Sequence, residues 1–287
     1  MTENKVAILA DSIACIPNDL RENYGIGVIP LNFYADGRVY KDGIDVNPYE
    51  AYQIFLQDPQ AFKTSSASPG DCLQAYRDFL CQGKEVLCIL LSSKLSALHA
   101  TACNAVEQVK TEYPGASVIV MDSQTAAAAE GLIALAAART ASDGGSLAEV
   151  KRVAERVRDK VNVVAYMDTI RYIYRSGRIP KIAAMAGSML QIKPMFAISS
   201  GVPHFMGAVR SKKIGIKRML EVMRRKVGAS PVHVAVMHTY AEDDAMRLKE
   251  TVAKEFNCAE LWLTEFSPLM GYACGTGTLG LAFYAEE

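Results

Sequence analysis

Hydroxyl and carboxyl side chains recur in turns at or near the carboxyl ends of predicted strands in the first half of the chain. These turns are Asp11-Ser12, Thr64-Ser65-Ser66, Ser92-Ser93 with Ser96, and Asp122-Ser123. In an open α/β sheet, ligands bind outside the carboxyl ends of the strands. Ser93 and Ser96 also precede a predicted helix, whose free N–H groups and dipole attract anions. Each residue alone is more typical of a helix N-cap, but the set predicts a site for a carboxylate or phosphate.

These turns lack the partners that a catalytic centre needs. No His or Lys completes a serine triad, and the sequence contains neither a GxSxG elbow nor a Walker A loop. His99 lies within a predicted helix, whereas His233 and His238 are five residues apart in a predicted strand and face opposite sides. We therefore expect a binding site with no catalytic residue, no metal and no cofactor. The alternative is a metal-dependent enzyme that uses Asp11 and Asp122 on a small carboxylated or phosphorylated metabolite.

A glycine-rich segment near the end of the sequence matches the pattern GxGxxG, running from Gly275 to Gly280. A dinucleotide-binding motif needs a strand before it, a helix after it and an acidic residue about 20 positions further on. Here seven residues follow Gly280, and the segment Leu279–Tyr284 is predicted to be a strand. We instead expect Gly275 and Gly277 to let the backbone pass close to a ligand head group or to another domain.

Methionine is unevenly distributed along the chain. Ten of the twelve Met residues follow residue 160, where chain length alone predicts about five. The flexible, polarizable thioether suits an adaptable apolar pocket, although core packing is the ordinary role of each such residue. We expect a long apolar pocket in the second half of the chain, and the candidates for its lining are Ile170, Met185, Met189, Met195 and Met206.

Eight basic residues and a single acidic residue occupy the window from Arg210 to Lys226. The default interpretation is a solvated helix face, and the alternative is a docking surface for an acidic partner or a phosphate. Nucleic-acid binding is a third interpretation. The whole chain has 31 basic and 31 acidic residues and hence no net charge, which argues against nucleic acid as the main partner.

Short apolar strands alternate with helices up to about residue 160. This alternation predicts a mostly parallel sheet with helices on both faces, built from strands at Val6–Leu9, Ile26–Tyr34, Val86–Leu91 and Val118–Met121. The hydroxyl-rich segment 63–69 is expected to be a loop. Beyond residue 160, a predicted hairpin around Ser200-Gly201 indicates a second α/β domain with a mixed or antiparallel sheet. We therefore expect two domains, 1–160 and 161–287.

The composition favours packed domains, because half of the 287 residues are hydrophobic and 22% are charged. No segment has the roughly 18 uninterrupted apolar residues of a membrane span, and the N-terminus does not match a signal peptide. The seven cysteines contain no CxxC pair. We expect a cytoplasmic protein with reduced cysteines and no integral membrane segment.

Taken in order, the motifs resemble the DegV family of bacterial fatty-acid-binding proteins. The likeness runs nearly from end to end, and each of its pieces is short. The segments that carry it are Ala10-Asp11-Ser12, Val28–Leu31, Lys63-Thr64-Ser65, Ser92–Ser96, Asp122-Ser123, Ser176-Gly177-Arg178-Ile179, Ile192-Lys193-Pro194, Arg210 with Lys212-Lys213, and Gly271–Gly280.

The resemblance implies two α/β domains with a fatty acid bound between them. Residues 1–160 would carry the head-group site, and residues 161–287 would line the acyl pocket. In the family, the Thr of the KTS motif and a Ser of the SSxLS motif bind the carboxylate. Here these residues are Thr64 and Ser93, and the motifs also contain the candidates Ser65 and Ser96.

Some DegV members present the bound acid to a separate fatty-acid kinase, which makes acyl phosphate for phospholipid synthesis. The resemblance therefore implies a lipid carrier that is not itself an enzyme. Arg178 and Arg210 match the arginines implied for that encounter or for the head group. The sequence departs from the family pattern GxHxGPG, because Ala273 stands in place of its His and Thr276 in place of its Pro. Loss of the His removes one carboxylate donor.

Overall fold

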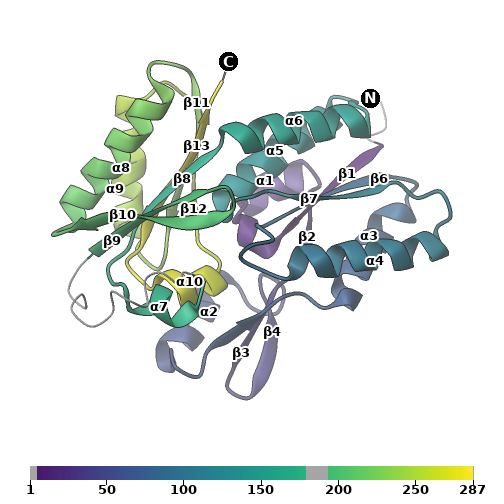
Figure 1. The fold of residues 1–287 in the computed structure, drawn as a ribbon, viewed down its shortest axis with the longest axis horizontal. Helices are drawn as coiled ribbons and strands as arrows, with labels where there is room; N and C mark the ends of the chain where they lie inside the picture. The colour runs from purple at the N-terminus through teal and green to yellow at the C-terminus, as the bar shows by residue number, and fades with distance from the viewer. Residues whose placement is uncertain (1–4, 179–192, 287) are drawn as a thin grey trace.

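The computed structural model describes residues 5–178 and 193–286, and the chain forms three sheets (Figure 1). One sheet is wholly parallel, one is mixed and six-stranded, and one is small and antiparallel. The prediction of an α/β fold with a parallel sheet followed by a mixed sheet is therefore confirmed. None of the helices in these two ranges is long and apolar enough to cross a membrane.

The parallel sheet has β1 at its centre, and all six residues of β1 are buried. Successive side chains of a strand point to opposite faces, so β1 contributes Val6 and Ile8 to one core and Ala7 and Leu9 to another. Helices α5 and α6 cover the first face, and α3 and α4 cover the second. In spatial order, the strands are β2 (Gly27–Ile29), β1 (Val6–Asp11), β6 (Glu85–Leu90) and β7 (Val118–Asp122). The helices are α3 (Pro69–Leu80), α4 (Leu98–Glu112), α5 (Ala128–Ser142) and α6 (Leu147–Lys160).

Helix α5 is buried on nearly every side because it lies between the two large sheets (Figure 1). Its small residues share one hydrophobic cluster with Met237, Trp262 and Ala282 of the second sheet. Alanine lets the helix approach both sheets closely, which explains the Ala-rich composition of this segment. The two sheets are therefore joined by a common core.

The second sheet is formed by the later part of the chain, and α8 and α9 cover its outer face (Figure 1). Its edge strands β10 and β9 form the predicted hairpin, while β11 and β12 run parallel. In spatial order, the strands are β10 (Val202–Val209), β9 (Lys193–Ser199), β8 (Asn162–Tyr166), β13 (Leu279–Ala285), β11 (Val232–His238) and β12 (Cys258–Glu265). The covering helices are α8 (Lys212–Val227) and α9 (Glu242–Glu255).

The expectation of one strand over Ile26–Tyr34 is wrong. The segment divides at Pro30, with β2 pairing in the large parallel sheet and β3 in the small one. Proline has no N–H to continue a ladder of hydrogen bonds, so the chain leaves the first sheet there. Residues 63–65, expected as loop, form the strand β5, whose register pairs Thr64 with Phe33. The small sheet consists of β4 (Arg38–Lys41), β3 (Asn32–Ala35) and β5 (Lys63–Ser65).

Late and early segments of the chain meet beside this small sheet, where α2 (Pro48–Gln57), α7 (Arg171–Ser176) and α10 (Pro268–Cys274) lie together (Figure 1). A Cβ atom on Gly271 of α10 would lie 2.3 Å from the Tyr52 ring of α2, so only glycine permits this approach. The Tyr52 hydroxyl donates a hydrogen bond to the carbonyl of Phe266 at 2.8 Å. These contacts tie α10 to elements that precede residue 160.

Candidate functional site

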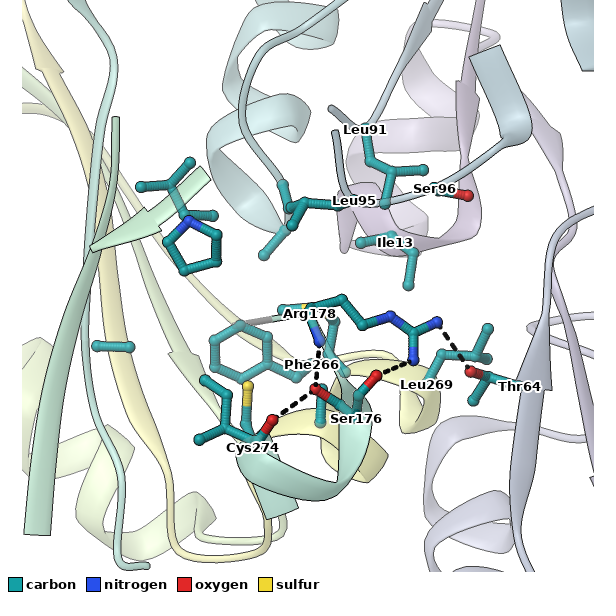
Figure 2. A pocket seen from close by; sticks show the side chains of 18 of the residues that line it. Ile13, Thr64, Leu91, Leu95, Ser96, Ser176, Arg178, Phe266, Leu269 and Cys274 are labelled. Atoms are coloured by element: carbon teal, nitrogen blue, oxygen red, sulfur yellow. Dashed lines mark hydrogen bonds between the residues drawn. The ribbon is translucent and has the colours of Figure 1, made fainter. Parts of the chain in front are cut away.

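A cavity with about 1020 Å³ of empty space, counting the part open to solvent, lies between the two large sheets. Its walls come from both halves of the chain, and most of the side chains that line it are apolar (Figure 2). The apolar lining includes Ile13, Leu91, Leu95, Val163, Ala165, Met167, Phe196, Ile198, Phe266, Leu269 and Met270.

Polar groups gather at one end of the cavity, where Arg178 faces Thr64 (Figure 2). The Nη2 atom of Arg178 lies 3.5 Å from the Thr64 hydroxyl, and Nη1 donates to the Ser176 carbonyl at 2.8 Å. Gly177 has φ +70° and ends α7 in the left-handed conformation, which turns the chain toward the cavity. Within the described chain, Arg178 forms no ion pair with a carboxylate.

Hydroxyl groups accompany this guanidinium, and Ser65, Ser66 and Ser96 line the same cavity. The Ser66 hydroxyl is buried and has no hydrogen-bond partner among residues 5–178 and 193–286. A buried polar group without a partner is costly, so Ser66 is ready to bond a ligand. The Ser96 hydroxyl accepts the N–H of Leu98 at 3.2 Å at the start of α4. Ser96 therefore accepts the first N–H of α4 and also lines the cavity wall.

Ser93 lies outside the lining of the cavity and is exposed. Its hydroxyl donates a hydrogen bond to Asp122 at 2.5 Å, and Asp122 also accepts the N–H of Gln124 at 2.8 Å. The structure thus brings Thr64, Ser65 and Ser96 together but leaves Ser93 in a turn at the edge of the parallel sheet. The carboxylate-binding role of Ser93 stays a prediction.

None of the described candidates for the apolar lining belongs to the lining of this cavity. Met195 is fully buried in the core under α8, on the other side of its sheet, and Met206 packs against that same core. Ile170 belongs to a small cluster with Met167 and Phe196, two residues that do line the cavity. Met185 and Met189 lie outside the described residues.

Sequence reasoning missed Met167, Phe196 and Met270 as cavity residues. The sequence did contain a signal for Met167. Apolar residues recur at every second position along β8 and just past it, at Val163, Ala165 and Met167, and such residues share one face of a strand. No comparable pattern marks Met270, because its place depends on how α10 folds back against the first half.

The first two glycines of the GxGxxG pattern pack against neighbouring segments and do not line this cavity. Both have positive φ, +80° at Gly275 and +82° at Gly277. A Cβ on Gly275 would lie 2.4 Å from the Tyr172 ring, and one on Gly277 would lie 2.8 Å from the Asp168 carboxylate. Their close approach is therefore to protein groups. Arg210 is exposed just after β10 and is likewise outside the lining.

The aspartate of the first motif supports the cavity wall and does not face a ligand. Asp11 is buried, and its two oxygens accept the N–H groups of Ile13 and Leu91, each at 2.8 Å. Both of those residues line the cavity. Burial raises the pKa of Asp11 to about 7. Among the described residues, no three His, Cys, Asp or Glu side chains are grouped to hold a metal ion.

The model of the DegV family, described as an uncharacterised protein family, matches residues 5–286. The chain belongs to the DegV family. A DegV domain-containing protein of Streptomyces coelicolor is 31% identical over 278 residues, which are 96% of this chain and 97% of that protein.

Solved structures of DegV proteins have the same fold. A DegV protein from Thermus thermophilus, described by its fatty acid binding, superposes with a TM-score of 0.88 at 28% identity, covering 98% of this chain and all of the other. Bacillus subtilis DegV, described as a fatty acid binding protein, has a TM-score of 0.88 at 25% identity, with 98% and 99% of the two chains covered. In the present DegV chain, Ala273 lines the cavity where the family pattern has a His.

Proposed function

We propose that this DegV chain is a carrier that holds one long-chain fatty acid in the cavity between its sheets. The carboxylate is bound by Arg178 and the hydroxyls of Thr64 and Ser65, and the hydrocarbon lies against the apolar walls. The observation that carries the proposal is the asymmetry of the cavity. It is apolar except at the end where a guanidinium, without an acidic partner in the described residues, meets several hydroxyls. The two relatives described as fatty acid binding proteins support it.

The two halves of the chain take different shares of this task. Residues 1–160 supply Thr64, Ser65 and Ser96 to the head group, and residues 161–287 supply Arg178 and the greater part of the hydrocarbon wall. A chain of about fifteen CH₂ groups at ~0.8 kcal/mol each gives a large gross driving force, although ordering of the ligand offsets much of it. A charge-assisted hydrogen bond from Arg178 adds specificity for an ionised carboxylate.

Mass spectrometry of the purified protein tests this function. We expect native spectra to show one ligand per chain and solvent extracts to contain a fatty acid. Delipidated protein should take up one palmitate, and should bind 1-hexadecanol, which lacks the carboxylate, at least about tenfold more weakly. Protein that is always empty and takes up no palmitate contradicts the proposal.

The carrier further presents its bound acid to a separate fatty-acid kinase, which makes acyl phosphate for phospholipid synthesis. The support is the exposure of Arg178 and Arg210, because exposed cations suit a partner that handles phosphate. A purified bacterial fatty-acid kinase with ATP should phosphorylate palmitate supplied on this chain. We expect Arg210→Ala to slow that reaction without weakening palmitate binding. Arg152→Ala, at an exposed position of α6 outside the basic window, is the matched control. A kinase that never uses the loaded chain contradicts this step.

A further inference from the structure

A second cleft lies at the carboxyl ends of the parallel strands β11 and β12, where α9 begins. It has about 1010 Å³ of empty space, counting the part open to solvent, and it shares no lining residue with the lipid cavity. The carboxyl edge of parallel strands is the usual place for a ligand in an α/β sheet. Tyr49 of α2 also borders the cleft, so the two halves of the chain form it jointly.

His238, the last residue of β11, has a ring nitrogen that no group in residues 5–178 or 193–286 engages. Only 6% of the residue is exposed, and its Nδ1 accepts the N–H of Ala241 at 3.3 Å. Because Nδ1 accepts that N–H, the neutral ring carries its proton on Nε2. Burial lowers the pKa of His238, which favours the neutral form. In the part of the chain that the structure describes, Nε2 has no partner, and the residue lines the cleft. The facing titratable groups are the carboxylates of Glu242 and Glu265.

The charges around the cleft favour a cation. Lys212 and Arg247 are its two basic residues, and both pair with the single carboxylate of Asp244. The other three carboxylates, from Glu242, Asp243 and Glu265, form no ion pair with a lysine or arginine in the described ranges. With His238 neutral, four carboxylates and two basic groups leave the lining with a net charge of −2. A phosphate would be repelled, whereas an ammonium or guanidinium group would be attracted.

Two tyrosines form an aromatic wall on the same cleft. The rings of Tyr49 and Tyr240 have centroids 6.0 Å apart, and both side chains are exposed. Tyr240 is held in place because its hydroxyl accepts a hydrogen bond from Gln53 at 2.6 Å and its ring lies beside that of Tyr52. The face of a tyrosine ring attracts a cation.

We infer that this cleft binds a small organic cation that also carries an oxygen acceptor, the pattern of a cationic amino acid. The unpaired carboxylates and the tyrosine rings take the cationic group. The Nε2–H of His238 takes the oxygen, together with the N–H groups in the first turn of α9, which have no partners within the helix. This site is independent of the fatty acid cavity, since the two share no residue.

Titration with L-arginine, followed by calorimetry, tests the inference. We expect saturable binding of one L-arginine per chain, and binding at least tenfold weaker for L-citrulline, which has nearly the same shape without the guanidinium charge. Glu242→Gln should weaken L-arginine binding at least threefold. Its matched control is Glu250→Gln, an exposed residue of α9 outside the cleft with the same change of charge.

The ¹⁵N resonance of His238 Nε2 supplies a readout that a general charge effect does not move. L-Arginine should shift this resonance in a saturable manner, while sodium acetate at the same ionic strength should leave it in place. No saturable binding in the millimolar range, equal affinity for L-citrulline, or equal effects of the Glu242 and Glu250 variants would each overturn the inference. Palmitate binding is unaffected in either case, so this test is separate from that of the carrier function.

Discussion

The guanidinium of Arg178 lies 3.5 Å from the hydroxyl of Thr64, although 114 residues separate them in the sequence. Arg178 follows α7 and Thr64 lies in β5, so their contact spans the polar end of the cavity (Figure 2). An arginine fork without an acidic partner can donate two hydrogen bonds to one carboxylate. Under the proposed function, we therefore expect the anionic head group to bind at this polar end of the cavity.

Replacing Arg178 with methionine should weaken palmitate binding about tenfold. A hydrogen bond to a charged group contributes about 1.5–3 kcal/mol, and each 1.4 kcal/mol is about a factor of ten. Arg171→Met is the matched control, because Arg171 is exposed on α7 outside the cavity lining. Binding of 1-hexadecanol should change little in either variant. Unchanged palmitate affinity in Arg178→Met would show that the guanidinium does not bind the head group.

The preference of the protein for acyl-chain length should depend on the size of the side chain at Ala165. This small residue of β8 lines the cavity, on the same face of the strand as Val163. Ala165→Phe would fill part of the hydrocarbon space and displace terminal CH₂ groups, each of which contributes about 0.8 kcal/mol when buried. We expect stearate binding to weaken at least tenfold and laurate binding to change much less. An equal loss of affinity for both acids would mean that Ala165 does not contact the terminal part of the acyl chain.

Ala127 should gain stability when it becomes glycine. It is buried in the cavity wall with φ 57° and ψ −151°, a conformation that only glycine adopts readily. Such strain costs of order 1–3 kcal/mol, and the added chain entropy of glycine offsets about 0.5–1 kcal/mol of it. Urea unfolding of Ala127→Gly should show a free energy of unfolding higher by about 1 kcal/mol.

The control for this prediction is Ala129→Gly, two residues later within α5. Ala129 lies in regular helix, where glycine costs about 1 kcal/mol. The two substitutions remove the same methyl group and should change stability in opposite directions. A loss of stability in both variants would mean that Ala127 is not strained.

Glu130 should make the protein less stable as the pH rises. It is fully buried in α5, and burial, followed by the nearby charge of Asp11, raises its pKa well above the usual value. One carboxylate oxygen accepts the N–H of Asp11 at 3.4 Å, and the other has no hydrogen-bond partner in the described part of the chain. Because the folded pKa is above the unfolded one, the folded state binds more protons between them. The stabilisation is thus complete below the unfolded pKa and is lost as the pH rises through the folded pKa.

Glu130→Gln tests this, since the amide has a similar shape and does not titrate. Between pH 5 and pH 7, the free energy of unfolding of the variant should rise relative to wild type by at most about 1.4 kcal/mol per pH unit. Chemical unfolding at several pH values measures the difference. Glu107→Gln, at an exposed position of α4, should leave the pH profile unchanged. Parallel profiles for wild type and Glu130→Gln would contradict the assignment.

Local sequence patterns were sufficient for elements whose ends are marked by capping residues. The basic window from Arg210 to Lys226, interpreted as a helix face, coincides with α8, which begins after the capping residue Ser211. Ser146 caps α6 in the same way. The predicted hairpin around Ser200-Gly201 is confirmed as β9 and β10. By contrast, Pro30 separates two strands that join different sheets, a change of partner that no local pattern reveals.

The sequence predicted several polar residues of the site, whereas the identity of its apolar lining depended on packing. Thr64, Ser65, Ser96 and Arg178 were candidates from motifs and all line the cavity. The methionine count pointed to a pocket, but Met195 lies in the core on the other side of its sheet. Composition cannot tell which face of a strand borders a cavity, because that depends on which helix covers the other face.

By itself, the sequence determined the α/β class, the hairpin of β9 and β10, and three hydroxyl residues of the cavity lining, Thr64, Ser65 and Ser96. Those features depend on residues close together in the chain: capping side chains, apolar periodicity and glycine turns. Only the tertiary structure decided that Arg178 meets Thr64 and that α10 packs on Tyr52. It also decided that Tyr49 and His238 border one cleft. These contacts join segments more than a hundred residues apart, and burial of apolar surface in a shared core, which carries no direction along the chain, brings them together.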